Sequence, residues 1–222
     1  MKFKLDLVAL EELPSIDTEN GRFYSIPSGE KYPSVTTVLG SQPEKKTILE
    51  KWKQRVGIET AEKISKQAAM RGTEVHSLME NYILHEQIPT GLMPTKKHIF
   101  DMFRTQLDKN LTTVRGSELP LYSHRIKLAG RTDLIGDWNG VPSVIDFKTS
   151  KKLKREDWIK DYFVQTTAYS LMFEELVGIH VPQIVVLIGI DEENQPQVFV
   201  RNRDNYAMDL FRIVEEYYRR IS

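Results

Sequence analysis

Two aspartates and a lysine interrupt strand-like segments that otherwise consist largely of apolar residues. Asp133 lies in the run 127–138, and Asp146 and Lys148 lie in the run 141–148. Two carboxylates beside a lysine are suited to divalent-metal chemistry on phosphates, because Mg²⁺ binds through one or two carboxylates, waters and phosphate oxygens. The lysine adds a positive charge for a phosphate or for an attacking water.

The dipeptide Asn139–Gly140 separates the two runs and predicts a tight hairpin, because both residues of a type I′ turn need positive φ. With a two-residue loop, the register places Asp133 directly opposite Asp146 and Arg131 opposite Lys148. Side chains alternate along a strand, so these four residues share one face. Facing carboxylates repel each other, and a bound divalent cation would compensate that repulsion.

The same pattern has a simpler interpretation, a solvated strand face carrying an Asp–Lys ion pair. Such a pair contributes about 0–1 kcal/mol. Motif matches of this length carry a real risk of being false, so the hairpin taken alone leaves both interpretations open.

The elements around these residues predict a mixed α/β fold, a central β-sheet flanked by helices. Residues 1–40 read as extended, with a hairpin turn at Ser28–Gly29. Helical spacing covers 44–56, 58–86 and 93–111, with Gly57 and Gly72 as candidate breaks. The remaining elements are strands at 113–123, 127–138 and 141–148, a helix at 155–177, strands at 183–190 and 196–202, and a helix at 206–221. The helix at 155–177 is a candidate crossover between parallel strands.

Composition limits the class of protein. A chain of 222 residues is long enough for one domain with a sizeable core. It has 31 basic and 31 acidic residues, so a DNA-binding surface must come from local segregation of charge. The chain contains no cysteine, which excludes disulfides, thiolate zinc sites, a cysteine nucleophile and a cysteine-ligated iron–sulfur cluster.

The hydropathy pattern and the first residues bear on location. No apolar run approaches the ~20 residues that a membrane-spanning helix needs. The start, MKFKLDLVALEELP, lacks the apolar core of a signal peptide and carries acidic residues, unlike a transit peptide. We therefore expect a soluble intracellular protein without a signal or transit peptide.

The acidic residues resemble the signature of a known enzyme superfamily. Glu118, Asp133 and the segment IDFK, which contains Asp146 and Lys148, resemble the acid…D…(D/E)xK pattern of PD-(D/E)XK nucleases. The proline of that pattern is replaced by Thr132. Further segments resemble the RecB-like branch: QTTAY, from Gln165 to Tyr169, its QxxxY helix motif, and GTEVH, ending at His76, its upstream histidine.

A longer series of segments resembles the mitochondrial genome maintenance exonucleases. These segments are YPSVTTVL, LEKWKQR, VIDFKTSKK and the C-terminal EEYY, and they follow in the same order from about residue 22 onwards. Because a transit peptide is not expected, a bacterial or bacteriophage relative in the cytoplasm is the better interpretation. The lack of cysteine separates the chain from relatives with an iron–sulfur cluster.

The resemblance implies a fold, an activity and a cofactor. It implies one nuclease domain over residues 1–222, with a hairpin and helical arch over 1–112 and a restriction-endonuclease-like catalytic core over 113–222. It implies a monomeric DNA exonuclease that uses Mg²⁺ or Mn²⁺ and prefers single strands or flaps. A single strand would pass through the arch.

The resemblance also implies roles at the site. It makes Lys148 the residue that orients water, with Gln165 and Tyr169 holding this lysine or a phosphate. The expected metal ligands are His76, Glu118, Asp133, Asp146 and the carbonyl of Phe147. The alternatives are an exposed strand acid for Glu118, a surface histidine bonded to Glu80 for His76, and ordinary polar contacts for Gln165 and Tyr169.

A second group of residues is predicted to contact DNA through cations, hydroxyls and an aromatic ring. These residues are Ser34, Thr36, Lys51, Trp52, Lys53, Arg55, Arg131, Thr149, Ser150 and Lys151. Two alternatives stay open: Trp52 could belong to the core, and Ser34 and Thr36 could cap a helix that starts there.

Two other functions remain alternatives to the exonuclease. A structure-specific endonuclease would cut circular single strands, whereas a threaded exonuclease needs a free end. A catalytically silent DNA-binding module would have no need of the paired carboxylates.

Overall fold

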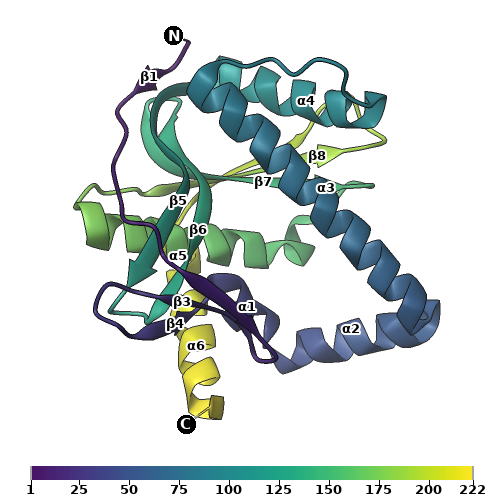
Figure 1. Ribbon diagram of the computed structural model, residues 1–222, viewed down its shortest axis with the longest axis vertical. Helices are drawn as coiled ribbons and strands as arrows, with labels where there is room; N and C mark the ends of the chain where they lie inside the picture. The colour runs from purple at the N-terminus through teal and green to yellow at the C-terminus, as the bar shows by residue number, and fades with distance from the viewer. Residues whose placement is uncertain (1, 222) are drawn as a thin grey trace.

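A six-stranded sheet forms the centre of the computed structural model, which describes residues 2–221 (Figure 1). In spatial order its strands are β1 (Lys4–Leu5), β5 (Leu111–Ser123), β6 (Leu128–Trp138), β7 (Val141–Ser150), β8 (Gln183–Ile190) and β9 (Gln197–Asn202). Strand β7 pairs antiparallel with β6 and parallel with β8. The parallel pair is joined by helix α5 (Lys160–Val177), after a 3₁₀ turn at Glu156–Trp158. The predicted mixed sheet and its crossover are confirmed.

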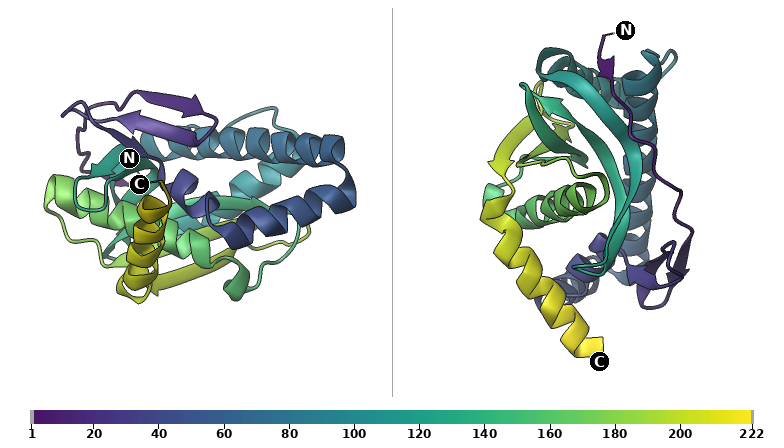
Figure 2. Two further views of the ribbon diagram at one scale, coloured as in Figure 1. Left: turned by 90° about the horizontal axis from the view of Figure 1, so that it is seen from below. Right: turned by 90° about the vertical axis from the view of Figure 1, so that its left-hand side faces the viewer.

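Helices cover both faces of this sheet (Figure 2). Helices α1 (Val35–Gly40), α5 and α6 (Asp204–Ile221) pack on one face. Helix α4 (Pro94–Asn110) and the second half of α3 (Ile58–His85) pack on the other. The central strands are therefore buried on both sides, which explains the uninterrupted apolar sequence of β8. No helix within residues 2–221 is long and apolar enough to cross a membrane.

A small three-stranded sheet precedes the first helix. Its strands are β2 (Ser15–Thr18), β3 (Gly21–Ser25) and β4 (Lys31–Pro33). The predicted turn at Ser28–Gly29 is present, and Gly29 has a φ of 87°, which glycine adopts without strain. The extended character predicted for residues 1–40 ends at Ser34, whose hydroxyl accepts a hydrogen bond from Thr37 N and caps α1.

Helix α2 (Pro43–Val56) and the first half of α3 extend away from the sheet (Figure 1). Helix α2 has no buried residue, and between Ile58 and Val75 only Ala61 is buried. We call residues 43–74 the arch. Gly57 separates its two helices as predicted, with a φ of 87°.

The predicted break at Gly72 is wrong, because α3 runs through it without interruption. Glycine in a helix interior is about 1 kcal/mol less favourable than alanine. An added Cβ at Gly72 would meet no atom within 4 Å, so nothing in the structure explains this glycine.

Candidate active site

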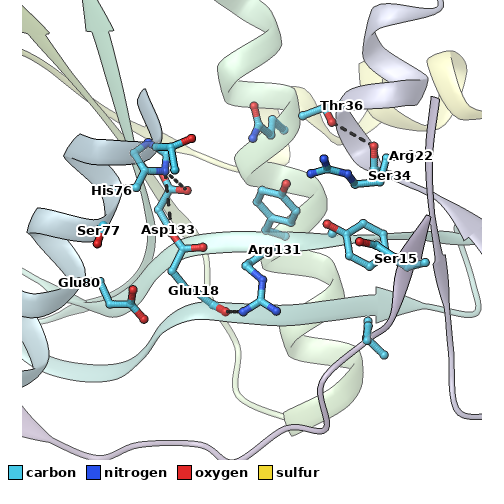
Figure 3. Close-up of a pocket in the computed structure, with 16 residues that line it drawn as sticks. Ser15, Arg22, Ser34, Thr36, His76, Ser77, Glu80, Glu118, Arg131 and Asp133 are labelled. Carbon is cyan, nitrogen blue, oxygen red and sulfur yellow. Dashed lines mark hydrogen bonds and ion pairs between the residues drawn. The ribbon is translucent and has the colours of Figure 1, made fainter. Parts of the chain in front are cut away.

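Two neighbouring strands and one helix bring two of the predicted acidic residues and the histidine together (Figure 3). Glu118 comes from β5, Asp133 from β6 and His76 from the second half of α3. One ligand atom from each of these three residues lies within 4.8 Å of the others. His76 Nδ1 lies 3.4 Å from Asp133 Oδ1 and 3.8 Å from Glu118 Oε1.

The hairpin has the predicted turn and most of the predicted register. Asn139 and Gly140 both have positive φ, 52° and 79°. The β6–β7 ladder then runs from Trp138 opposite Val141 to Leu134 opposite Ile145.

The ladder ends one step before the expected aspartate pair. Asp133 Oδ2 instead accepts a hydrogen bond from Phe147 N at 2.8 Å. The expectation that Arg131 lies opposite Lys148 is wrong, because the β6–β7 ladder does not extend beyond Leu134 and Ile145. The strands separate where the aspartate side chain replaces a backbone partner.

Burial excludes the solvated strand face. The side chain of Asp146 is 2% exposed and that of Lys148 is 22% exposed. Lys148 Nζ donates to Asp146 Oδ1 at 2.6 Å, whereas Asp146 Oδ2 is buried and has no hydrogen-bond partner within residues 2–221. Burial raises the pKa of Asp146 to about 6, even though the lysine charge opposes this. A half-compensated buried carboxylate is costly unless a further positive group binds it.

Glu118 occupies an unusual backbone conformation. Its φ is 51°, in the left-handed region that costs a residue other than glycine about 1–3 kcal/mol. Burial, followed by the Asp133 charge, raises the pKa of its carboxyl group to about 7. Its side chain is only 25% exposed, which argues against an ordinary exposed strand acid.

The tautomer of His76 follows from its partner. Nε2 lies 2.9 Å from the carbonyl oxygen of Phe147, and since a carbonyl only accepts, Nε2 is the donor. In the neutral imidazole, Nδ1 then directs a lone pair toward the two carboxylates. His76 thus bonds Phe147 rather than Glu80, and the Phe147 carbonyl, predicted as a metal ligand, is engaged by the histidine.

The donor set fits a divalent cation. Glu118 and Asp133 offer carboxylates, and His76 offers an imidazole nitrogen. Asp146 lies close enough to Asp133 and His76 for their charges to affect its pKa, and its unpartnered oxygen offers a further carboxylate ligand. Carboxylates suit Mg²⁺ and Mn²⁺, and the imidazole suits Mn²⁺ better. A bound cation would lower the pKa of a coordinated water and neutralise charge on a phosphate.

Lys148 has three neighbours that keep it charged and fixed. Burial lowers its pKa, but the carboxylates of Asp146 and Asp133 outweigh burial and leave that pKa raised. The ammonium group lies 5.2 Å from the ring centre of Tyr162. Lys148 therefore presents a fixed positive charge at the site.

The predicted α5 pair lies beside the site without touching that lysine. Gln165 and Tyr169 both line the pocket, but the described residues include no hydrogen bond from either to Lys148. Burial raises the pKa of the Tyr169 phenol, so it stays neutral. Gly130 permits this packing, because a Cβ there would lie 2.8 Å from the Tyr169 ring. Tyr162 and Asp146, rather than Gln165 and Tyr169, thus contact Lys148.

The site opens into a pocket of about 630 Å³. Three predicted DNA contacts line it: Ser34, buried as a helix cap, Thr36, exposed beside it, and Arg131. Arg131 donates to the Glu118 carbonyl and forms an ion pair with Glu12. The capping alternative is therefore correct for Ser34, which also faces the pocket.

Several lining residues were missed from the sequence, and they fall into two groups. The first shares the helix face of His76 and could have been found from helical spacing: Thr73, Ser77 and Glu80. The second group belongs to the small sheet and to the segment just before it: Leu13, Ser15, Arg22 and Tyr24. These residues reach the pocket through tertiary packing, which no sequence pattern near them indicates.

Two predicted groups of DNA contacts do not line the pocket. Lys51, Trp52, Lys53 and Arg55 lie on α2, in the arch, and Thr149–Lys151 lie at the end of β7 and beyond it. Trp52 is half-buried and no residue of α2 is buried, so the core alternative for Trp52 is wrong.

Comparison with known proteins identifies the superfamily of this chain. Mitochondrial genome maintenance exonuclease 1 of Mus musculus is 28% identical over 131 residues, and that of Homo sapiens is 26% identical over 137 residues. Each match covers 55% of this chain but only 38% of the relative. The crystal structure of SSO0001 has a TM-score of 0.48 and 15% identity, covering 83% of this chain and 73% of that one. Residues 95–221, more than half of the chain, match the model of the PD-(D/E)XK nuclease superfamily, and the chain belongs to that superfamily.

Proposed function

We propose that this chain is a divalent-metal-dependent DNA exonuclease that acts on single strands or flaps with a free end, in DNA replication, recombination or repair. The observation that carries the proposal is the buried, unpartnered Asp146 oxygen beside a cluster of His76, Glu118 and Asp133. A nuclease needs such a site to hold a cation against a phosphate.

Each residue has a distinct part in this proposal. Glu118, Asp133 and Asp146 hold the cation, with Mg²⁺ as the working ion and Mn²⁺ as a substitute that the imidazole of His76 accepts well. Lys148 orients the attacking water and stabilises negative charge on the phosphate in the transition state. All of these residues come from one chain, so a monomer is sufficient for turnover.

The arch supports the choice of an exonuclease over an endonuclease. Its α2 helix has no buried residue and carries Lys51, Lys53 and Arg55, cations of the kind that bind the backbone of a single strand. Threading through such an arch requires a free end. The partial similarity to mitochondrial exonucleases supports the same choice.

A digestion assay tests the proposal. End-labelled linear and circular single-stranded DNA are incubated with wild type or Lys148→Ala, in Mg²⁺, Mn²⁺ or EDTA. We expect wild type to degrade only the linear strand, only with metal, and the variant to be inactive. Cleavage of the circle would favour an endonuclease, and absence of cleavage with every metal would refute nuclease activity.

A further inference from the structure

A second hollow lies next to the active-site pocket and meets it at Thr36. It has a volume of about 700 Å³ and lies between the β2–β3 turn, α1, the start of α2 and the end of α6. We call it the hairpin groove. Thr36 is exposed and lines both the groove and the active-site pocket, so the two hollows adjoin at this residue.

Two cations in the groove lack acidic partners. Lys46, in the first turn of α2, and Arg220, near the end of α6, are both exposed and form no ion pair within residues 2–221. Arg220 Nη2 donates to Ser41 Oγ at 3.1 Å, which orients its guanidinium group and leaves other donors free. Most arginines of this chain are instead paired, as Arg219 is with Glu215 at 2.7 Å.

The rest of the lining suits nucleotides. Phe23 offers a partly exposed ring. Thr36, Thr37 and Ser41 line the α1 side, where hydrogen bonds to Ser34, Arg22 and Val38 hold their hydroxyl groups in place. Glu19 supplies the one carboxylate among the lining residues, against two cations. Single-stranded nucleic acids bind to such grooves by phosphate–cation contacts together with base stacking on aromatic rings.

We propose that the hairpin groove holds nucleotides of the same single strand whose scissile phosphate lies at the metal centre, with Lys46 and Arg220 on consecutive parts of its backbone and Phe23 against a base. This inference rests on the proposed function, because it extends the path of that substrate. The groove also lies at the foot of the arch, where Pro43 and Lys46 of α2 line it, and it adjoins the active-site pocket at Thr36.

Charge reversal tests the groove. Affinity for fluorescently labelled single-stranded oligonucleotides of increasing length is measured with Mg²⁺ in the Lys148→Ala background, with and without Lys46→Glu and Arg220→Glu. We expect roughly tenfold weaker binding of long strands at low salt, and a salt slope reduced by about 1.4, since each phosphate contact on a single strand contributes about 0.7. The loss of affinity should be smaller for strands that are too short to extend beyond the active-site pocket.

A matched pair of substitutions controls for net charge. Lys109→Glu with Arg125→Glu changes the charge equally on exposed residues that form no ion pair within residues 2–221 and lie outside both hollows, and we expect the affinity and salt slope of the Lys148→Ala background. Equal losses in test and control pairs, or no loss in the test pair, would overturn the groove assignment. If the chain with Lys148 intact does not hydrolyse linear DNA at all, the proposed function fails instead, which separates the two ideas.

Discussion

The strands that carry the acidic residues and the arch are built in opposite ways. Leu134 and Ile145, next to the two aspartates, are fully buried on β6 and β7. In the arch, by contrast, Ile48, Ile58 and Met70 are 67%, 66% and 58% exposed. The acidic residues are thus fixed by a core, whereas the arch is fixed mainly where its ends join the rest of the chain.

Under the proposed function, this difference suits the two regions to different work. A metal site needs ligands held within a fraction of an ångström, which packed strands provide. A surface that follows a flexible strand needs accessible cations and rings, which a helix without a core face provides. The four predictions below separate chemistry from strand contact, starting with the largest expected effect.

Replacing Asp146 tests the chemical role of the strands. We expect Asp146→Asn to reduce turnover of linear single-stranded DNA by at least a factor of about 100, because the cation loses a carboxylate while the side chain keeps its size. The control is Asp137→Asn, on β6 and outside the pocket, where the carboxylate pairs with Arg115. Turnover in single-turnover assays decides the question, and equal activity of both variants would contradict the assignment.

Truncating one isoleucine in each region compares their contributions to stability. Ile145 is 0% exposed and Ile64, in the arch, is 43% exposed. We expect Ile145→Ala to lower the free energy of unfolding by about 2–5 kcal/mol and Ile64→Ala by less than about 0.5 kcal/mol. Urea denaturation measures both, and similar losses would show that the arch is part of the core.

The pH dependence of the free energy of unfolding should report the titration of two buried carboxyl groups at the site. The pKa of Glu118 is raised to about 7 and that of Asp146 to about 6. Both carboxyl groups hold a proton more tightly in the folded chain, so without metal the free energy of unfolding falls as pH rises from about 4 to 7. The expected fall is on the order of 1–3 kcal/mol.

Two comparisons sharpen this pH prediction. Glu118→Gln combined with Asp146→Asn should flatten the profile, and Mn²⁺ should offset the fall because it binds the ionised carboxylates. Denaturation at pH 5 and pH 8 is sufficient to measure it. A metal-free wild type that becomes more stable over this range would contradict the burial argument.

Reversing charge in the arch should have the smallest effect on the chemistry itself. We expect Lys51→Glu with Lys53→Glu to raise KM for long linear strands by roughly threefold to tenfold at low salt and to leave kcat unchanged. Steady-state kinetics at two salt concentrations measure this. A fall in kcat without a change in KM would place these lysines in the catalytic step.

The sequence predicts the local parts of the site well. Asn139–Gly140 needs positive φ at both positions, so the turn and the register as far as Leu134 follow from two residues. The spacing of apolar residues likewise predicts helix α5 between two strands, and with it the crossover that joins the parallel pair β7 and β8. These features depend on neighbours in the chain, which a sequence displays directly.

The remaining features depend on contacts between distant segments. The left-handed backbone of Glu118 and the ion pair of Arg131 with Glu12 have no local signal. Tertiary packing also fixes the bond from His76 to Phe147, and with it the tautomer. The uninterrupted helix at Gly72 shows the reverse case, where a strong local signal for a break is overridden.

The most direct test of the central claim is anomalous diffraction from crystals of the chain soaked with Mn²⁺. The account predicts one strong peak bonded to oxygens of Asp133 and Asp146, beside Glu118 and Nδ1 of His76, with Lys148 adjacent. A peak elsewhere, or none while the buried Asp146 oxygen stays unpartnered, would contradict the claim that these strands form a metal-dependent nuclease site.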